Sequence, residues 1–159
     1  DTSYRAVGMQ EMIDKVRSTG AKNIVVVGGL DWGYTLDGAV GENALHDPDG
    51  NGIILDSHVY PWKRLEWELD IGTLDREFPI LIGEFGHYGN DAKPVEGVQR
   101  LPSEEWMPRL LSWIEEHGYS FTAWDFHPKA GPCLIKSFAG EPTEYHGVYV
   151  KEFLLGHNK

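Results

Sequence analysis

The sequence is poor in cysteine, in basic residues and in long apolar runs, and each shortage excludes a class of protein. Cys133 is the only cysteine, so no disulfide can form within the chain and a zinc site built from several cysteines is excluded. The 14 Lys and Arg residues are outnumbered by 25 Asp and Glu residues. The net charge of −11 argues against nucleic acid or an anionic membrane surface as a partner. No run of about 18 apolar residues occurs, so we expect no membrane-spanning helix.

The length suits one domain, residues 1–159, but falls short of the roughly 250 residues that a complete eight-stranded α/β barrel usually needs. Hydrophobic residues make up 41% of the chain, which is enough to build a core. No signal-peptide pattern is found, and the chain starts at Asp1 without a methionine. We therefore leave its localisation open: secreted if it is processed from a longer precursor, and cytoplasmic otherwise.

Four short apolar runs, rich in β-branched residues, predict strands that are buried on both faces, as in a parallel sheet. These runs are residues 23–28, 52–58, 78–83 and 120–124. Apolar residues at helical spacing predict helices over 7–16, 63–75, 103–117 (capped by Ser103) and 148–155. The order predicts an α/β fold, (βα)4, in which four parallel strands form half of a TIM-type barrel. Because an open four-stranded sheet leaves two edge strands unpaired, we expect self-association to complete the barrel.

Polar and aromatic residues follow the predicted strands at their carboxyl ends, where α/β barrels hold their catalytic residues. Glu84 closes a buried strand, and burying a carboxylate there without a partner or a chemical task is costly. His58 and Tyr60 lie two residues apart at the preceding strand end, so both can point the same way and donate hydrogen bonds to Glu84. Glu84 is thus predicted to be a nucleophile or general base, with a salt bridge as the alternative. Trp124 and Trp32 offer flat faces that suit sugar rings, although packing is the ordinary use of a lone tryptophan.

Metal binding is a competing interpretation of the same region. His58, Glu84, His87 and His127 could hold zinc or another transition metal, but their spacings match no compact metal motif. The turn at residues 47–52 lacks the glutamate and flanking helices of a calcium-binding loop. We therefore expect no metal and no other cofactor.

Four motifs in register resemble strands five to eight of family 5 (cellulase-type) glycoside hydrolases. They are NIVVVGGLDW at 23–32, DSHVYP at 56–61, PILIGEFG at 79–86 and TAW at 122–124, and together they span nearly the whole chain. The resemblance implies an endoglucanase-type enzyme that hydrolyses a β-linked glucan or mannan with retention. Glu84 would be its nucleophile, with His58 and Tyr60 around it. Trp124 and Trp32 would bind the sugar.

The same resemblance implies a missing residue. Retaining hydrolysis needs a second carboxylate about 5–5.5 Å from the nucleophile, acting first as acid and then as base. In the family it belongs to an Asn-Glu pair that ends strand four, and no such pair precedes the first predicted strand. The chain is then a fragment without its N-terminal half, a half-barrel that dimerises, or a catalytically inactive half that binds glycans or serves as an assembly module. In a symmetric dimer, we expect Asp125 or His127 of the second copy to stand where the acid/base belongs.

Overall fold

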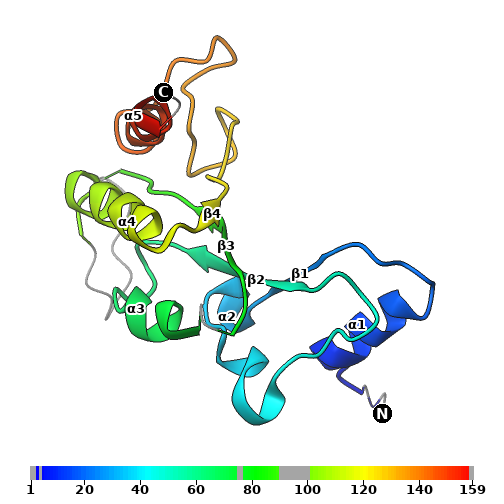
Figure 1. The fold of residues 1–159 in the computed structure, drawn as a ribbon. Helices are drawn as coiled ribbons and strands as arrows, with labels where there is room; N and C mark the ends of the chain where they lie inside the picture. Colours follow the sequence, from blue (N-terminus) through cyan, green and yellow to red (C-terminus); the bar gives the residue numbers. More distant parts are fainter. Residues whose placement is uncertain (1–2, 4, 75–76, 90–100, 158–159) are drawn as a thin grey trace.

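Four parallel strands form one sheet whose order follows the chain (Figure 1). The structure is a computed structural model, and it describes residues 3, 5–74, 77–89 and 101–157. The strands are β1 (Val25–Gly28), β2 (Ile53–Val59), β3 (Ile80–Phe85) and β4 (Ser120–Phe121). Each overlaps a predicted run, so the parallel α/β sheet is confirmed. β4 is shorter than predicted, but backbone hydrogen bonds from Thr122 and Trp124 still attach the following residues to β3.

Helical segments connect the strands, and two details of their prediction were wrong. They are α1 (Met9–Arg17), α2 (Leu30–Gly33), α3 (Trp67–Asp70), α4 (Ser103–His117), α5 (Gly147–His157) and the 3-10 turns η1 (Asp37–Ala39), η2 (Gly41–Asn43) and η3 (Gly72–Leu74). The predicted helix 63–75 is reduced to α3 and η3, separated near Gly72, a poor helix former; residue 75 lies outside the described residues. Pro102, not Ser103, takes the N-cap position of α4, because the helix already begins at Ser103 and Pro102 is the last residue with extended backbone. The Ser103 hydroxyl donates to the neighbouring Glu104 carboxylate. None of the described helices is long and apolar enough to cross a membrane.

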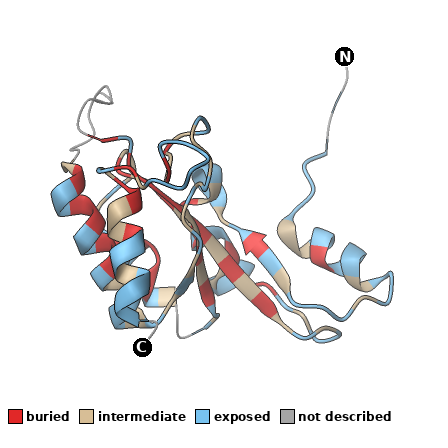
Figure 2. Ribbon diagram, turned by 90° about the horizontal axis from the view of Figure 1, so that it is seen from above, coloured by how far each residue is buried: buried red, intermediate tan, exposed pale blue. Residues whose placement is uncertain are grey.

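The core lies against the middle of the sheet. Alternate residues of β2 are buried, which is the pattern of a strand with one face on the core (Figure 2). The prediction of strands buried on both faces was therefore wrong: the other face of β2 is only partly covered. On α4, Trp106, Leu110 and Ile114 recur at helical spacing and are almost completely buried in the same cluster as Leu55 of β2. β2 and β3 are therefore the strands that pack most completely against the core. The ends of these two strands carry the predicted catalytic residues.

The β1 edge is packed less completely. In Figure 1, α1 lies beyond β1, on the far side of the sheet from α4 and α5. Ile13 is the one buried residue of α1, and Val26 in β1 is 51% exposed. A buried ion pair holds α1 to the loop before β2: Arg17 Nε lies 2.7 Å from Asp47 Oδ1, and a second guanidinium nitrogen bonds Oδ2. This guanidinium lowers the pKa of the Asp47 carboxyl, so the pair persists into mildly acidic solution.

Candidate active site

Glu84 reaches the edge of the sheet through a break in the strand register. β2 and β3 pair regularly as far as Ser57, which lies opposite Ile82, and the next pair is His58 with Glu84. Gly83 is thus an extra residue in β3, and its insertion brings Glu84 opposite His58. The carboxylate and the imidazole of two neighbouring strands are placed side by side in this way.

Glu84, His58 and Tyr60 form one group. The Tyr60 hydroxyl donates to Glu84 Oε2 over 2.8 Å, and His58 Nδ1 lies 3.4 Å from the same oxygen. The Glu84 and His58 side chains are each 27% exposed, so a ligand can reach them from solvent. Burial and the bond to Glu84 raise the pKa of the Tyr60 phenol, so it remains a hydrogen-bond donor at neutral pH. The structure therefore brings together the three residues that the sequence pattern singled out.

An open hollow of about 760 Å³ surrounds this group, a size typical of small-molecule sites. Aromatic rings make up much of its wall. The lining residues are Trp32, His58, Tyr60, Trp62, Lys63, Glu84, Tyr88, Trp124, Gly131 and Pro132. Both tryptophans predicted to bind sugar are among them. Glu84 is the one carboxylate among the described residues that line the hollow.

Trp62 and Tyr88 also line the hollow, and neither was among the predicted site residues. The Tyr60 and Trp62 rings stack with centroids 4.5 Å apart and planes 9° apart, and the Tyr88 ring follows 5.7 Å from Trp62. The Tyr88 hydroxyl donates to the Gly131 carbonyl over 2.9 Å, which holds this ring in place. The alternation His58, Tyr60, Trp62 at the end of β2 could have revealed Trp62. Together the three rings form an aromatic stack that lines one side of the hollow.

Lys63 holds Trp32 at the rim of the hollow. Asp31 and Trp32 have φ angles of 51° and 56°, a left-handed conformation that is uncommon outside glycine. Lys63 Nζ donates to Asp31 Oδ2 over 2.7 Å and to the Asp31 carbonyl over 2.9 Å, and it lies 5.3 Å from the centre of the Trp32 ring. The Trp32 residue is 88% exposed, so its free face is presented to solvent.

His146 supports Trp124 on the other side of the hollow. His146 Nε2 donates to the Trp124 carbonyl over 2.9 Å, and the Trp124 amide donates to the Phe85 carbonyl over 2.9 Å. Burial lowers the pKa of His146 to about 4, so the ring is neutral at pH 7 and keeps a donor at Nε2. No local sequence signal connects His146 with Trp124, because 22 residues separate them.

A family model described as cellulase (glycosyl hydrolase family 5) matches residues 6–130. The chain belongs to glycosyl hydrolase family 5. Beta-mannanase/endoglucanase A of Caldicellulosiruptor saccharolyticus is 26% identical over 108 residues, an alignment that covers 64% of this chain and 8% of that protein.

Solved structures agree with this assignment at the level of the fold. β-Glucanase SdGluc5_26A from Saccharophagus degradans matches with a TM-score of 0.79 at 22% identity, covering 94% of this chain and 46% of that one. β-Mannanase from Streptomyces thermolilacinus matches with a TM-score of 0.61 at 21% identity, covering 86% of this chain and 47% of that one. The chain spans about half the length of these solved relatives and a small part of the Caldicellulosiruptor protein. The predicted half-barrel is therefore confirmed.

Within one copy of this family 5 half-barrel, the two acid/base candidates do not line the hollow around Glu84. Asp125 Oδ1 is buried and has no hydrogen-bond partner among the described residues, and the Asp125 amide donates to the Pro132 carbonyl. His127 turns into its own loop, where Nδ1 accepts from the amides of Lys129 and Ala130. A role for either residue across a dimer interface stays a prediction.

The alternative metal site of His58, Glu84, His87 and His127 is not assembled in the family 5 fold. His87 is buried, its Nε2 donates to the Leu101 carbonyl over 3.1 Å, and its Nδ1 accepts a backbone amide two residues later. Within the described part of the chain, no group of three or more His, Cys, Asp or Glu residues could hold a metal ion.

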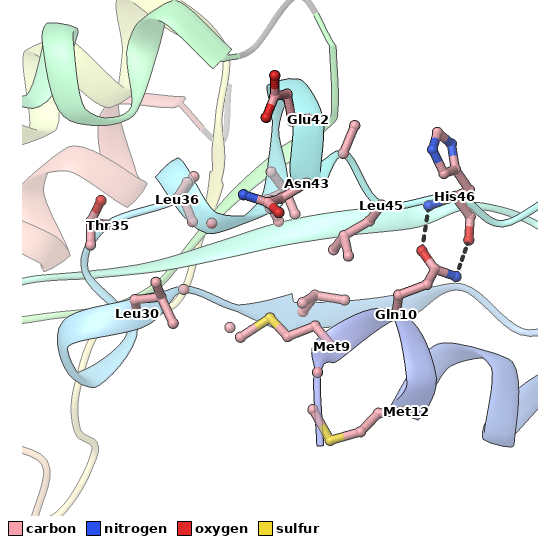
Figure 3. Close-up of a pocket in the computed structure, with 18 of the residues that line it drawn as sticks. Met9, Gln10, Met12, Leu30, Thr35, Leu36, Glu42, Asn43, Leu45 and His46 are labelled. Atoms are coloured by element: carbon pink, nitrogen blue, oxygen red, sulfur yellow. Dashed lines mark hydrogen bonds between the residues drawn. The ribbon is translucent and has the colours of Figure 1, made fainter. Parts of the chain in front are cut away.

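A second hollow, of about 610 Å³, lies at the β1 edge (Figure 3). Met9 and Met12 of α1 line it together with Leu45 from the loop between η2 and β2. The Gln10 side-chain amide bonds both the amide and the carbonyl of His46 and so joins α1 to this loop. Because its lining is mostly apolar, we assign this hollow no part in catalysis.

Proposed function

We propose that this half-barrel forms part of a retaining glycoside hydrolase in which Glu84 is the nucleophile. The observation that carries the proposal is the contact of Glu84 Oε2 with the Tyr60 hydroxyl and the His58 ring, at the base of an aromatic hollow. In retaining hydrolysis a carboxylate attacks the anomeric carbon and forms a covalent glycosyl-enzyme, which water then cleaves.

Tyr60 and His58 are placed to orient the Glu84 carboxylate. The hydrogen bond from the Tyr60 hydroxyl and the contact with the His58 ring fix the direction of the carboxylate, and a nucleophile must be held in this way to attack. The bond from Tyr60 also restrains rotation of the Glu84 side chain. We infer that the two residues orient the nucleophile and that Trp32 and Trp124 stack against sugar rings.

The substrate class that we propose is a β-linked glucan or mannan. The exposed rings of Trp32 and Trp124 at the hollow suit pyranose rings. The relatives support the class through their names: a β-glucanase crystallised with cellotetraose, a β-mannanase crystallised with mannohexaose, and a beta-mannanase/endoglucanase. The choice between glucan and mannan depends on sugar-binding residues that the other half of a barrel would supply.

The acid/base must come from outside the described residues of the hollow. We propose that it is supplied by another half-barrel, either an N-terminal half or a second copy of this chain. For the second copy, Asp125 is the favoured candidate and His127 the next. The choice of Asp125 rests on its position directly after Trp124 at the rim. Because its Oδ1 is buried within its own copy, the proton transfer would fall to Oδ2.

The nucleophile can be tested without the missing acid. In 2,4-dinitrophenyl 2-deoxy-2-fluoro-β-cellobioside, dinitrophenolate leaves with the electron pair of the C1–O bond and needs no proton. The attacking carboxylate forms an ester at C1, and the fluorine slows its hydrolysis. We expect intact-mass spectrometry to detect one adduct per chain, on the peptide that contains Glu84. A mannose analogue of the reagent tests mannan against glucan.

Glu84→Gln keeps the shape of the side chain and should abolish the adduct, whereas Glu105→Gln, an exposed change on α4, should leave it intact. An adduct on another residue would refute the assignment of Glu84. If the unlabelled wild-type chain still binds cellotetraose in calorimetry, the alternative of a catalytically inactive glycan-binding half is favoured. With neither labelling nor binding, an assembly module remains.

Dimer formation is tested by light scattering, which gives 17.9 kDa for a single chain and twice this mass for a pair. Should a dimer hydrolyse β-glucan, mixing two inactive variants, Glu84→Gln and Asp125→Ala, would be decisive. Each mixed dimer holds one intact site, so random exchange of subunits should restore about a quarter of wild-type activity. Full activity of a dimeric Asp125→Ala variant would exclude Asp125 as the acid/base.

A further inference from the structure

We propose that Asp56 is a positioning residue that holds the His58 ring against Glu84. The inference rests on the proposed function, because it assigns a task to a residue behind the nucleophile. Asp56 does not line the hollow, and its side chain is only 15% exposed, so it acts through His58 and does not touch substrate.

The His58 ring lies between two carboxylates. Its Nε2 is 3.1 Å from Asp56 Oδ2, and its Nδ1 is 3.4 Å from Glu84 Oε2. Asp56 and His58 are two residues apart on β2, so their side chains project from the same face of the sheet. A carboxylate only accepts hydrogen bonds, so Asp56 fixes a proton on Nε2 and thereby the orientation of the ring. When Nδ1 is also protonated, the ring donates to both carboxylates at once.

Gly83 provides the space that Asp56 occupies. A Cβ atom at position 83 would lie 2.0 Å from Asp56 Oδ1, which is far inside contact distance. Gly83 is also the extra residue that brings Glu84 opposite His58. The same glycine therefore sets the position of the nucleophile and leaves room for the carboxylate that holds its neighbour.

Gly33 closes the other side of the ring. Its φ of 85° favours glycine, and a Cβ there would lie 2.8 Å from both Cγ and Nδ1 of His58. The backbone after β1 thus packs directly on the imidazole. His58 is confined by Gly33 from α2, by Asp56 from its own strand and by Glu84 from β3.

The hydrogen bonds of Asp56 point to the same task. Its Oδ1 is buried and has no partner among the described residues, and the partner of its Oδ2 is His58. An aspartate kept for structural support would be expected to use both oxygens, as Asp47 does with Arg17. The position of Asp56 is therefore explained by the histidine that it orients.

The test compares Asp56→Ala and Asp56→Asn with wild type in two measurements on the full chain. In ¹⁵N spectra of the histidine rings, we expect wild-type His58 to carry a proton on Nε2 and Asp56→Ala to change its ring signals. We expect labelling by the 2-fluoro cellobioside reagent to slow about tenfold to a hundredfold in Asp56→Ala, the effect of a misplaced catalytic group. Asp56→Asn, whose amide oxygen can still accept from Nε2, should retain most of the rate.

Asp37→Asn removes the same charge at an exposed position and should change neither measurement. Gly83→Ala should reproduce Asp56→Ala, because the added methyl group displaces the carboxylate. Wild-type labelling rates and unchanged His58 signals in a folded Asp56→Ala variant would overturn the positioning role while leaving Glu84 as nucleophile. Absence of labelling in wild type would refute the proposed function instead, and the ring signals would still decide whether Asp56 orients His58.

Discussion

The middle of the sheet and its β1 edge are built from similar apolar residues but are packed differently. Along β2 and β3 the core-facing residues are buried, and Leu55 and Ile82 have no exposed surface. At the β1 edge, Val26 is 51% exposed and Ile24 is 49% exposed, and Met12 of α1 is 50% exposed. Similar apolar strand sequences are therefore buried against the core in β2 and β3 but half exposed to solvent at the β1 edge.

The exposed apolar residues of β1 suit this strand to pairing with a further strand. A free edge that carries exposed β-branched residues is a place where another strand or half-barrel can pair. The chain spans about half of its solved relatives, and β1 would be an interior strand in a complete barrel. We infer that β1 is adapted to burial that the described chain alone does not provide.

The largest effect on stability is expected in the middle of the sheet. Leu55→Ala should lower the free energy of unfolding by about 2–5 kcal/mol, because it removes a buried side chain and leaves a cavity. Urea unfolding followed by circular dichroism measures this change. A loss below about 1 kcal/mol would show that the middle strands are packed no better than the edge.

His146 is expected to make the free energy of unfolding depend on pH. Its pKa is about 4 in the folded chain and 6.5 in the unfolded chain, so the unfolded state binds the proton more tightly. The free energy of unfolding should fall by about 3 kcal/mol as the pH drops from 6.5 to 4, and this contribution should level off below pH 4. His146→Gln, whose amide can still donate to the Trp124 carbonyl, should show a shallower slope in urea titrations over this range. Parallel slopes would contradict the prediction.

Tyr60→Phe should affect the site without affecting the fold. It removes the hydroxyl that donates to Glu84 Oε2 but keeps the ring that stacks on Trp62. A hydrogen bond to a charged group is worth about 1.5–3 kcal/mol, so the labelling rate at Glu84 should fall about tenfold to a hundredfold. Tyr88→Phe, which loses a bond to the Gly131 carbonyl, is the matched control and should change the rate much less.

The smallest effect is expected at the edge strand. Val26→Thr keeps the β-branched shape at a half-exposed position and should change the stability of the single chain by no more than about 0.5 kcal/mol. If the edge pairs with another half-barrel, Val26→Lys should weaken that association in light scattering while unfolding of the single chain stays nearly unchanged. Equal losses for Val26→Thr and Leu55→Ala would remove the contrast between the two regions.

The strands and the group around Glu84 could be predicted because their signals are local. A short apolar run followed by a polar residue predicts both a buried strand and a group at its end, and His58, Tyr60 and Glu84 were found in this way. The alternation of residues also placed His58 and Tyr60 on one side of the strand. The family resemblance agreed with these positions.

Other features depend on tertiary contacts that no local pattern reveals. The apolar spacing of α1 predicted a helix correctly, but Ile13 alone is buried there, because burial depends on a surface that the described chain lacks. His146 and Asp56 act through contacts with Trp124 and His58 that appear only in three dimensions. The extra residue at Gly83 could not be predicted either, because register is a property of two strands.

Every contact that defines the proposed nucleophile crosses a single boundary, that between β2 and β3. Neighbours in the sheet are also neighbours along the chain, so this boundary can form without waiting for distant segments to meet. The segments after β1 and β4 add Trp32 and Trp124 to the rim, whereas the side-chain hydrogen bond to Glu84 comes from Tyr60, beyond the end of β2. Substitutions in those outer segments are therefore expected to change which polysaccharide the proposed enzyme holds while leaving the contacts of Glu84 unchanged.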